Sequence, residues 1–197
     1  MSENTREKLI TTAIRIMAVK GFNNTGIAEI LAEVGVPKGS FYHYFKSKDE
    51  LGFAIIEFYG QVLYGSLSEH LTLTKGRAIV RLRSYFEMLI EYFETDFSHC
   101  NCLLGNLAQE LAIQNPEMRR AIFDRYLAIE KLIAACLVKA KSEGDVAAVV
   151  DETKFAAVLF SCWEGCLVRA KLAQCSSPLV EFLALYFSNV TSITKRT

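Results

Sequence analysis

The stretch "PKGSFYHYFKSKDEL", residues 37–51, sets four aromatic rings into five consecutive positions between lysines. Aromatic rings are usually buried and lysines are usually exposed, so these side chains must face different surroundings. Phe41 and Phe45 are four residues apart and therefore share one face of a helix. Tyr42 and His43 lie off that face. The stretch predicts a short helix that buries two phenylalanines and presents its other rings to a partner.

The residues before this helix predict another helix and a tight turn. Ile27, Ile30 and Leu31 would face inward on the first helix. Thr25 reads as the N-cap of that helix, and Gly35 lies at the centre of the turn that follows it. A short helix, a turn containing glycine and a second short helix form the helix-turn-helix that reads DNA.

Two further signals bound the second helix. Pro37 fits its first turn, where the missing N–H costs little. Ser47 reads as the N-cap of the next helix, with Asp49 and Glu50 near the positive N-terminus of that helix. We call the second helix of this motif the reading helix. We therefore expect the reading helix to be followed directly by a longer helix.

Several side chains of this segment suit contact with DNA. The polar tips of Tyr42 and His43 can reach base edges, thymine methyl groups or phosphates. Gly39 permits close approach of the backbone, and Ser40 can donate a hydrogen bond to a phosphate. Lys48, near the start of the next helix, is a natural phosphate anchor.

The net charge of zero conceals an asymmetry along the chain. Residues 1–48 hold seven Lys or Arg and four Glu, a net charge of +3, whereas residues 49–197 carry a net charge of −3. We call residues 1–48 the head and residues 49–197 the body. A modestly basic head on an acidic body indicates an anionic partner at the head. The imbalance is small and supports the helix-turn-helix motif only as a secondary signal.

The segment "TGIAEILAEVGVPKGSFYHYFKSKDEL", residues 25–51, closely resembles the N-terminal domain of the TetR family of bacterial transcriptional repressors. The likeness covers about residues 5–55. It implies a homodimer, a palindromic double-stranded DNA operator and repression that a ligand or chemical signal relieves. It also implies that the family's DNA-contact positions are occupied here by Thr25, Gly26, Lys38, Gly39, Ser40, Tyr42, His43 and Lys48.

Helical periodicity runs through the whole chain, and we expect an all-α fold of about nine helices. The first helix would cover residues 3–20, two short helices would lie within 25–45, and the fourth would run to about residue 70. Five further helices are expected at about 75–95, 102–113, 116–143, 151–174 and 178–193. We expect a DNA-binding helix-turn-helix domain at residues 1–48 and an effector-sensing and dimerisation domain at 49–197.

No window of eighteen residues is apolar and uncharged, so a membrane span is not expected. The N-terminal "MSENTREKLI" lacks the apolar run of a signal peptide. We therefore expect a cytoplasmic protein whose six cysteines are thiols.

The last two expected helices carry more apolar surface than one helical layer needs. "FAAVLFSCWEGCLVRAKL" has a broad apolar face, and "PLVEFLALYFSNV" has another. Burial in the core accounts for part of this surface. Dimerisation through a four-helix bundle, which the family resemblance implies, accounts for the excess.

A second stretch, "HCNCLLGNLAQEL" at residues 99–111, bears on the signal. It resembles a segment of the TetR branch that includes the N-ethylmaleimide reductase repressor and acrylate-pathway repressors, although Asn101 replaces the branch's glycine. Members of that branch respond to electrophiles or oxidants through cysteine, or bind small acids or other ligands. The resemblance therefore leaves the signal open.

Cys102 is the candidate sensor in this stretch. It would lie in the first turn of a helix, where the helix dipole stabilises a thiolate, and His99 could add positive charge. A reactive thiolate could be alkylated, or oxidised reversibly to sulfenic acid. Lys171 could pair with the thiolate or with an acidic ligand, and Asn106 and Trp163 complete the candidate effector site. The alternative is that Cys102 is a buried core thiol and Lys171 a solvated charge.

Other readings of the sequence are weaker. His99, Cys100 and Cys102 offer soft metal ligands, as do Cys162 and Cys166, but no paired CxxC motifs occur, so neither a metal nor another cofactor is expected. No Ser/His/Asp triad pattern, glycine-rich phosphate loop or paired-carboxylate motif indicates an enzyme.

The alternative to a DNA-binding regulator is a small-molecule-binding or thiol-reactive helical protein that has lost DNA binding.

Overall fold

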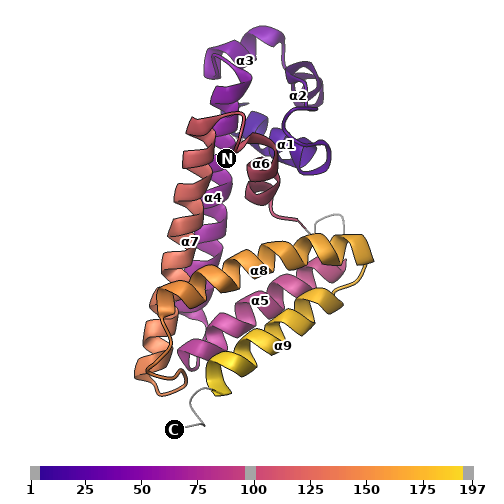
Figure 1. Cartoon of the computed structure of the whole chain (residues 1–197). Helices are drawn as coiled ribbons and strands as arrows, with labels where there is room; N and C mark the ends of the chain where they lie inside the picture. Colours follow the sequence, from indigo (N-terminus) through magenta and orange to yellow (C-terminus); the bar gives the residue numbers. More distant parts are fainter. Residues whose placement is uncertain (1–4, 96–100, 193–197) are drawn as a thin grey trace. The chain divides into compact units, whose positions relative to one another are not determined.

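The computed structural model describes residues 5–95 and 101–192, and within those ranges it contains nine helices and no strand (Figure 1). The all-α prediction is confirmed. None of the described helices is both long and apolar enough to cross a membrane. The helices are α1 (Thr5–Lys20), α2 (Ile27–Val34), α3 (Lys38–Tyr44), α4 (Lys48–Leu73), α5 (Ala78–Thr95), α6 (Leu103–Leu111), α7 (Pro116–Ser142), α8 (Glu152–Ala173) and α9 (Ser177–Ser192).

The chain forms two compact units that interleave along the sequence. The first unit comprises residues 1–62 and 102–126, and the second comprises residues 63–101 and 127–197. Helices α4 and α7 each begin in the first unit and end in the second. The functional division at residue 48 stays a prediction, because these units follow packing rather than function.

The first unit is built around α1, α2 and α3, whose apolar faces meet in one core. Leu9, Met17, Ile30, Phe41 and Phe45 are all buried there. The turn between α2 and α3 depends on Gly35, whose φ of 74° is left-handed and whose N–H donates to the carbonyl of the α2 residue four positions earlier at 2.9 Å. The predicted inward roles of Phe41 and Phe45 are confirmed.

The prediction that Thr25 is the N-cap of α2 is wrong. The N-cap is Gly26, which makes no side-chain capping bond. The Thr25 hydroxyl instead donates to the carbonyl oxygen of Gly21 at 2.7 Å, and its side chain is only 1% exposed. A buried hydroxyl needs such a partner, and the carbonyl left free at the end of α1 supplies it.

The start of α4 follows the predicted capping pattern. The Glu50 N–H donates to Oγ of Ser47 at 3.1 Å, and the Lys46 N–H donates to Oε2 of Glu50 at 2.7 Å. This reciprocal arrangement satisfies donors that a helix N-terminus leaves without partners. The reading helix α3 is therefore followed after only a short break by a firmly started α4.

The second unit packs α8 against α9, with α5 alongside α9 (Figure 1). Trp163 of α8 is buried between Phe86 and Phe93 of α5, with ring centroids 4.9 Å and 6.3 Å apart. Tyr186 of α9 donates its hydroxyl to the carbonyl oxygen of Phe155 at 2.9 Å. These contacts join the three helices through large rings, which bury more apolar area than aliphatic side chains do.

Candidate nucleic-acid interface and sensor segment

An open groove on the first unit gathers most of the predicted DNA-contact residues. Five of the eight line it: Thr25, Gly26, Lys38, Tyr42 and Lys48. The remaining lining residues are Asn23, Asn24, Ile27, Ala28, Leu31, Ala32 and Val36. The groove thus runs between the start of α2, the start of α3 and the first residue of α4.

Helix α3 divides its side chains between the core and the surface. Phe41 is fully buried, whereas its neighbour Tyr42 is 50% exposed and His43 is exposed. Nζ of Lys38 lies 6.0 Å from the centroid of the Tyr42 ring. A cation held near an exposed ring with a polar tip suits contact with both phosphate and base edges.

Gly39 is not required by packing within the described residues. A Cβ atom built at Gly39 would meet no heavy atom within 4 Å. Gly39 is the second residue of α3, and its lack of a side chain leaves the backbone there open to close approach. Close approach of DNA to α3 at this glycine stays a prediction. Ser40 is half-buried, and its N–H donates to the Pro37 carbonyl at 2.9 Å.

Two predicted contact residues also have roles inside the first unit. The hydroxyl of Thr25 is bonded to the main chain, so that side chain forms part of the groove floor. Nζ of Lys48 donates to the Asn23 carbonyl at 3.2 Å and lies 4.7 Å from the centroid of the Phe22 ring. Burial lowers the pKa of Lys48, and the carboxylates of Glu110 and Asp49 oppose that shift. Both residues order the turn before α2, and their contact with DNA stays a prediction.

Glu110 is a residue whose role the sequence did not reveal. It lies near the end of α6, and its two carboxylate oxygens accept hydrogen bonds from the Phe22 N–H at 3.0 Å and the Asn23 N–H at 2.9 Å. Its partners are 88 and 87 positions away in the sequence. Gly21 leaves room for this carboxylate, because a Cβ atom at Gly21 would lie 2.3 Å from Oε1 of Glu110.

The candidate sensor Cys102 is the N-cap residue of α6, with its side chain 9% exposed. The Asn106 N–H donates to the Cys102 carbonyl at 3.0 Å, which closes the first turn of the helix. Cys102, Asn106 and Glu110 thus lie on one short helix of the first unit. Lys171 is half-buried and Trp163 lies in the aromatic core, both in the second unit. Their predicted meeting with Cys102 stays a prediction.

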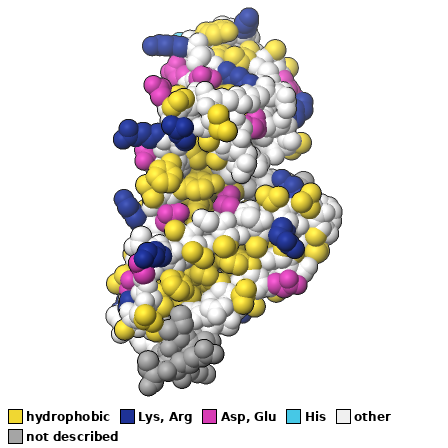
Figure 2. Space-filling view, viewed as in Figure 1, with side chains coloured by type: hydrophobic (Ala, Val, Ile, Leu, Met, Phe, Trp, Pro, Cys, Tyr) yellow, Lys and Arg dark blue, Asp and Glu magenta, His cyan; other side chains and the backbone are white. Residues whose placement is uncertain are grey.

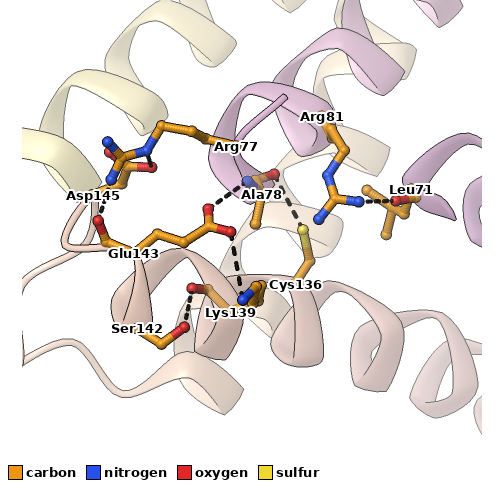
Figure 3. A network of polar contacts seen from close by, with 9 residues as sticks. All are labelled: Leu71, Arg77, Ala78, Arg81, Cys136, Lys139, Ser142, Glu143 and Asp145. Carbon is orange, nitrogen blue, oxygen red and sulfur yellow. Dashed lines mark hydrogen bonds and ion pairs between the residues drawn. The ribbon is translucent and has the colours of Figure 1, made fainter. Parts of the chain in front are cut away.

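Cys136 is a buried thiol in a different setting, within the polar network of Figure 3. Its Sγ donates to the Ala78 carbonyl at 3.3 Å, and burial raises the pKa of Cys136 to about 11. Around it, Arg77 pairs with Asp145 at 2.7 Å and the Ala78 N–H donates to Glu143 at 2.7 Å. These bonds fix the start of α5 against the loop after α7. A thiol held in its protonated form is a poor nucleophile, so Cys136 is a structural cysteine.

The residues that the structure describes offer no support for the metal-binding alternative. Among them, no group of three or more His, Cys, Asp or Glu side chains could hold a metal ion. His99 and Cys100, on which that interpretation partly rested, lie outside the described residues.

The exposed sides of α8 and α9 carry apolar residues, and apolar side chains gather over these helices in Figure 2. The exposed ones are Val158, Val168, Leu172, Val180 and Leu185. On α8 they recur at helical spacing along one side together with the exposed Cys162. The buried apolar residues of these two helices form the core part of the expected surface: Leu159, Trp163, Leu167, Leu179, Leu183, Tyr186 and Phe187.

Comparison with known proteins places both parts of the chain in one family. Residues 9–55 match the model described as bacterial regulatory proteins of the tetR family, and residues 78–186 match the tetracyclin repressor-like C-terminal domain. The chain belongs to the TetR family. It is therefore a DNA-binding transcriptional regulator rather than an enzyme, and the alternative of a helical protein without DNA binding is set aside.

Relatives of this TetR-family regulator match along most of their length. Transcriptional regulator AcuR of Cereibacter sphaeroides is 31% identical over 89% of this chain and 80% of AcuR. The HTH-type transcriptional repressor NemR of Escherichia coli K12 is 29% identical over 92% of this chain and 91% of NemR. The crystal structure of reduced E. coli NemR superposes with a TM-score of 0.85 at 28% identity, over 95% of this chain and 97% of that one. The resemblance of the body to this branch is thereby confirmed.

Proposed function

We propose that this regulator is a repressor that binds a palindromic operator as a homodimer and is released by a signal sensed in its C-terminal domain. The observation that carries the proposal is the groove on the first unit. It brings the exposed Tyr42 together with the basic Lys38 and Lys48. Since its target is bacterial chromosomal DNA, the protein would act in the cytoplasm.

Dimerisation through α8 and α9 is the second part of the proposal. The exposed apolar side chains on these helices lack a covering layer among the described residues of the chain. A second copy supplies a layer of matching chemistry, and the four helices together form a bundle. Two reading helices would then enter successive major grooves about 34–36 Å apart. A palindromic operator follows from that two-fold symmetry.

Replacing Tyr42 with alanine is expected to lower operator affinity about tenfold or more without lowering stability appreciably. The ring is half exposed and lies on the groove, so its removal deletes a DNA contact but leaves the core intact. Fluorescence anisotropy with duplexes from the region upstream of the gene measures the affinity, and thermal unfolding measures the stability. Tyr64→Ala, an exposed tyrosine on α4, is the matched control. Equal binding by Tyr42→Ala and wild type would exclude this interface.

The signal is a small molecule or an electrophile or oxidant, with Cys102 as the candidate sensor. Support comes from the position of Cys102 at the start of α6, where the helix dipole stabilises a thiolate. Asn106 lies on the same helix. Lys171 and Trp163, both in the second unit, stay proposed effector contacts. The signal would shift α4, which begins at the head and ends in the second unit, and so alter the spacing of the two reading helices.

Treatment with N-ethylmaleimide is expected to weaken operator binding of the wild type by about 5- to 150-fold, the usual range of allosteric coupling. The Cys102 thiolate adds across the maleimide double bond, and the resulting enolate takes a proton from water. The adduct is too large for a site that is 9% exposed, so α6 must move. Cys102→Ser should lose this response, whereas Cys175→Ser, outside α6, should keep it. A normal response by Cys102→Ser would assign the sensor to another residue.

A further inference from the structure

The carboxylate of Glu110 is hydrogen-bonded to the turn that joins α1 to α2. Its oxygens accept from two successive backbone N–H groups, at Phe22 and Asn23, at 3.0 Å and 2.9 Å. Hydrogen bonds to an ionised acceptor are roughly twice as strong as those between neutral groups. The side chain therefore fixes the turn in position relative to α6, in addition to the apolar packing of the helix.

The space for this carboxylate depends on Gly21. A Cβ atom at that position would lie 2.3 Å from Oε1 of Glu110, closer than nonbonded atoms approach. Gly21 also has a φ of 82°, which side chains rarely tolerate. Both the conformation and the clearance of the turn are thus matched to the carboxylate of α6.

The other side of the same turn belongs to the DNA-binding groove. Asn23 accepts a hydrogen bond from Nζ of Lys48 through its carbonyl, and both residues line the groove. Phe22 is buried beneath the ammonium group of Lys48. The turn is therefore held at its N–H groups by α6 and at a carbonyl by the first residue of α4. A shift of α6 that withdraws the carboxylate would change the wall of the groove directly.

We propose that Glu110 is the positioning residue through which α6 sets the operator affinity of the head. With both hydrogen bonds in place, the start of α2 is fixed in the arrangement that binds DNA. Displacement of α6 leaves two N–H groups without their acceptor, and the turn reorganises to satisfy them. This route acts alongside the shift of α4, and it rests on the proposed function because it requires operator binding by the head.

Thermodynamic reciprocity gives a test that needs no effector. If α6 controls operator affinity, operator binding must in turn stabilise α6. Hydrogen exchange of the full-length protein, read by mass spectrometry with and without a duplex from its own upstream region, measures this. In the wild type, we expect the duplex to slow exchange in peptides covering residues 103–111 by about threefold or more, along with exchange in α3.

Glu110→Gln keeps the shape of the side chain but removes its charge and one acceptor. We expect it to bind the duplex about five- to tenfold more weakly. At saturating duplex, exchange in α3 should slow as in the wild type, but the protection of α6 should disappear. Gly21→Ala, which crowds the carboxylate and strains the left-handed turn, should reproduce that loss. Glu117→Gln, at an exposed position in the first turn of α7, is the matched control and should behave as wild type.

The outcomes separate this inference from the proposed function. Failure of the wild type to bind the duplex overturns the proposed function, and the inference with it. Binding that protects α3 but not α6 in the wild type leaves the function standing and overturns the role of Glu110. Full protection of α6 in Glu110→Gln does the same, because the hydrogen bonds would then be structural only.

Discussion

Replacing Leu185 with aspartate is expected to convert the protein to a monomer and to lower its operator affinity by about 10²–10⁴-fold. Leu185 is 64% exposed on α9, on the apolar side that we assign to the dimer. Two aspartates placed by symmetry at a buried interface would lose their hydration and repel each other. Each head would then bind its half-site alone and lose the gain in effective concentration that the second head provides.

Sedimentation equilibrium and operator anisotropy on the same samples check this expectation. The wild type should have twice the 22.1 kDa mass of the chain, and Leu185→Asp should have the single mass. Val149→Asp places the same charge at another exposed apolar position, in the loop before α8, and should remain dimeric. A dimeric Leu185→Asp with wild-type affinity would move the interface away from α9.

The helices were predictable because their signals are local. Gly21 and Gly35 end α1 and α2 with left-handed backbones, and Ser47 begins α4 as its sequence position indicates. The periodicity of apolar residues along α7 matches its buried stripe, for example at Met118, Ile122, Ile129, Ile133 and Leu137. Each of these features depends on residues within a few positions of one another, so the sequence alone expresses them.

The site was less predictable, because its contacts join residues distant in sequence. Thr25 and Lys48 are polar residues at expected DNA-contact positions, yet both also bond to the main chain within the first unit. No residue near Glu110 in the sequence indicates that its carboxylate accepts hydrogen bonds from the backbone N–H groups of Phe22 and Asn23. A carboxylate near the end of an amphipathic helix most often faces solvent, and only the folded chain distinguishes this one.

The interleaving of the two units was also beyond the sequence. A division at residue 48 follows from the end of the helix-turn-helix motif, which is a local pattern. The packing instead places α6 in the same unit as α1 to α3, although about sixty residues separate the motif from it. This arrangement puts the candidate sensor Cys102 and the DNA-reading segment in one body, which shortens the path that a signal must travel.

Replacing Phe41 with alanine is expected to destabilise the head by about 3–5 kcal/mol, the usual cost of removing a buried aromatic ring. Phe41 is 0% exposed, and its ring lies 5.6 Å from that of Phe45. A cavity at this point removes the packing that holds α3 against the core. Operator affinity should therefore fall even though Phe41 is not on the groove. Thermal unfolding followed by circular dichroism, together with hydrogen exchange in α2 and α3, measures the loss.

Phe41→Ala and Tyr42→Ala form a natural pair, because adjacent rings on one helix are assigned opposite roles. Both should lower operator affinity, but only Phe41→Ala should accelerate hydrogen exchange in the free protein. Phe41→Leu, which refills part of the cavity, should recover part of the stability and of the affinity together. No such recovery is expected for Tyr42→Leu, because an aliphatic side chain cannot replace the hydroxyl that the groove presents. Equal stability of Phe41→Ala and Tyr42→Ala would contradict the division of α3 into a core face and a DNA face.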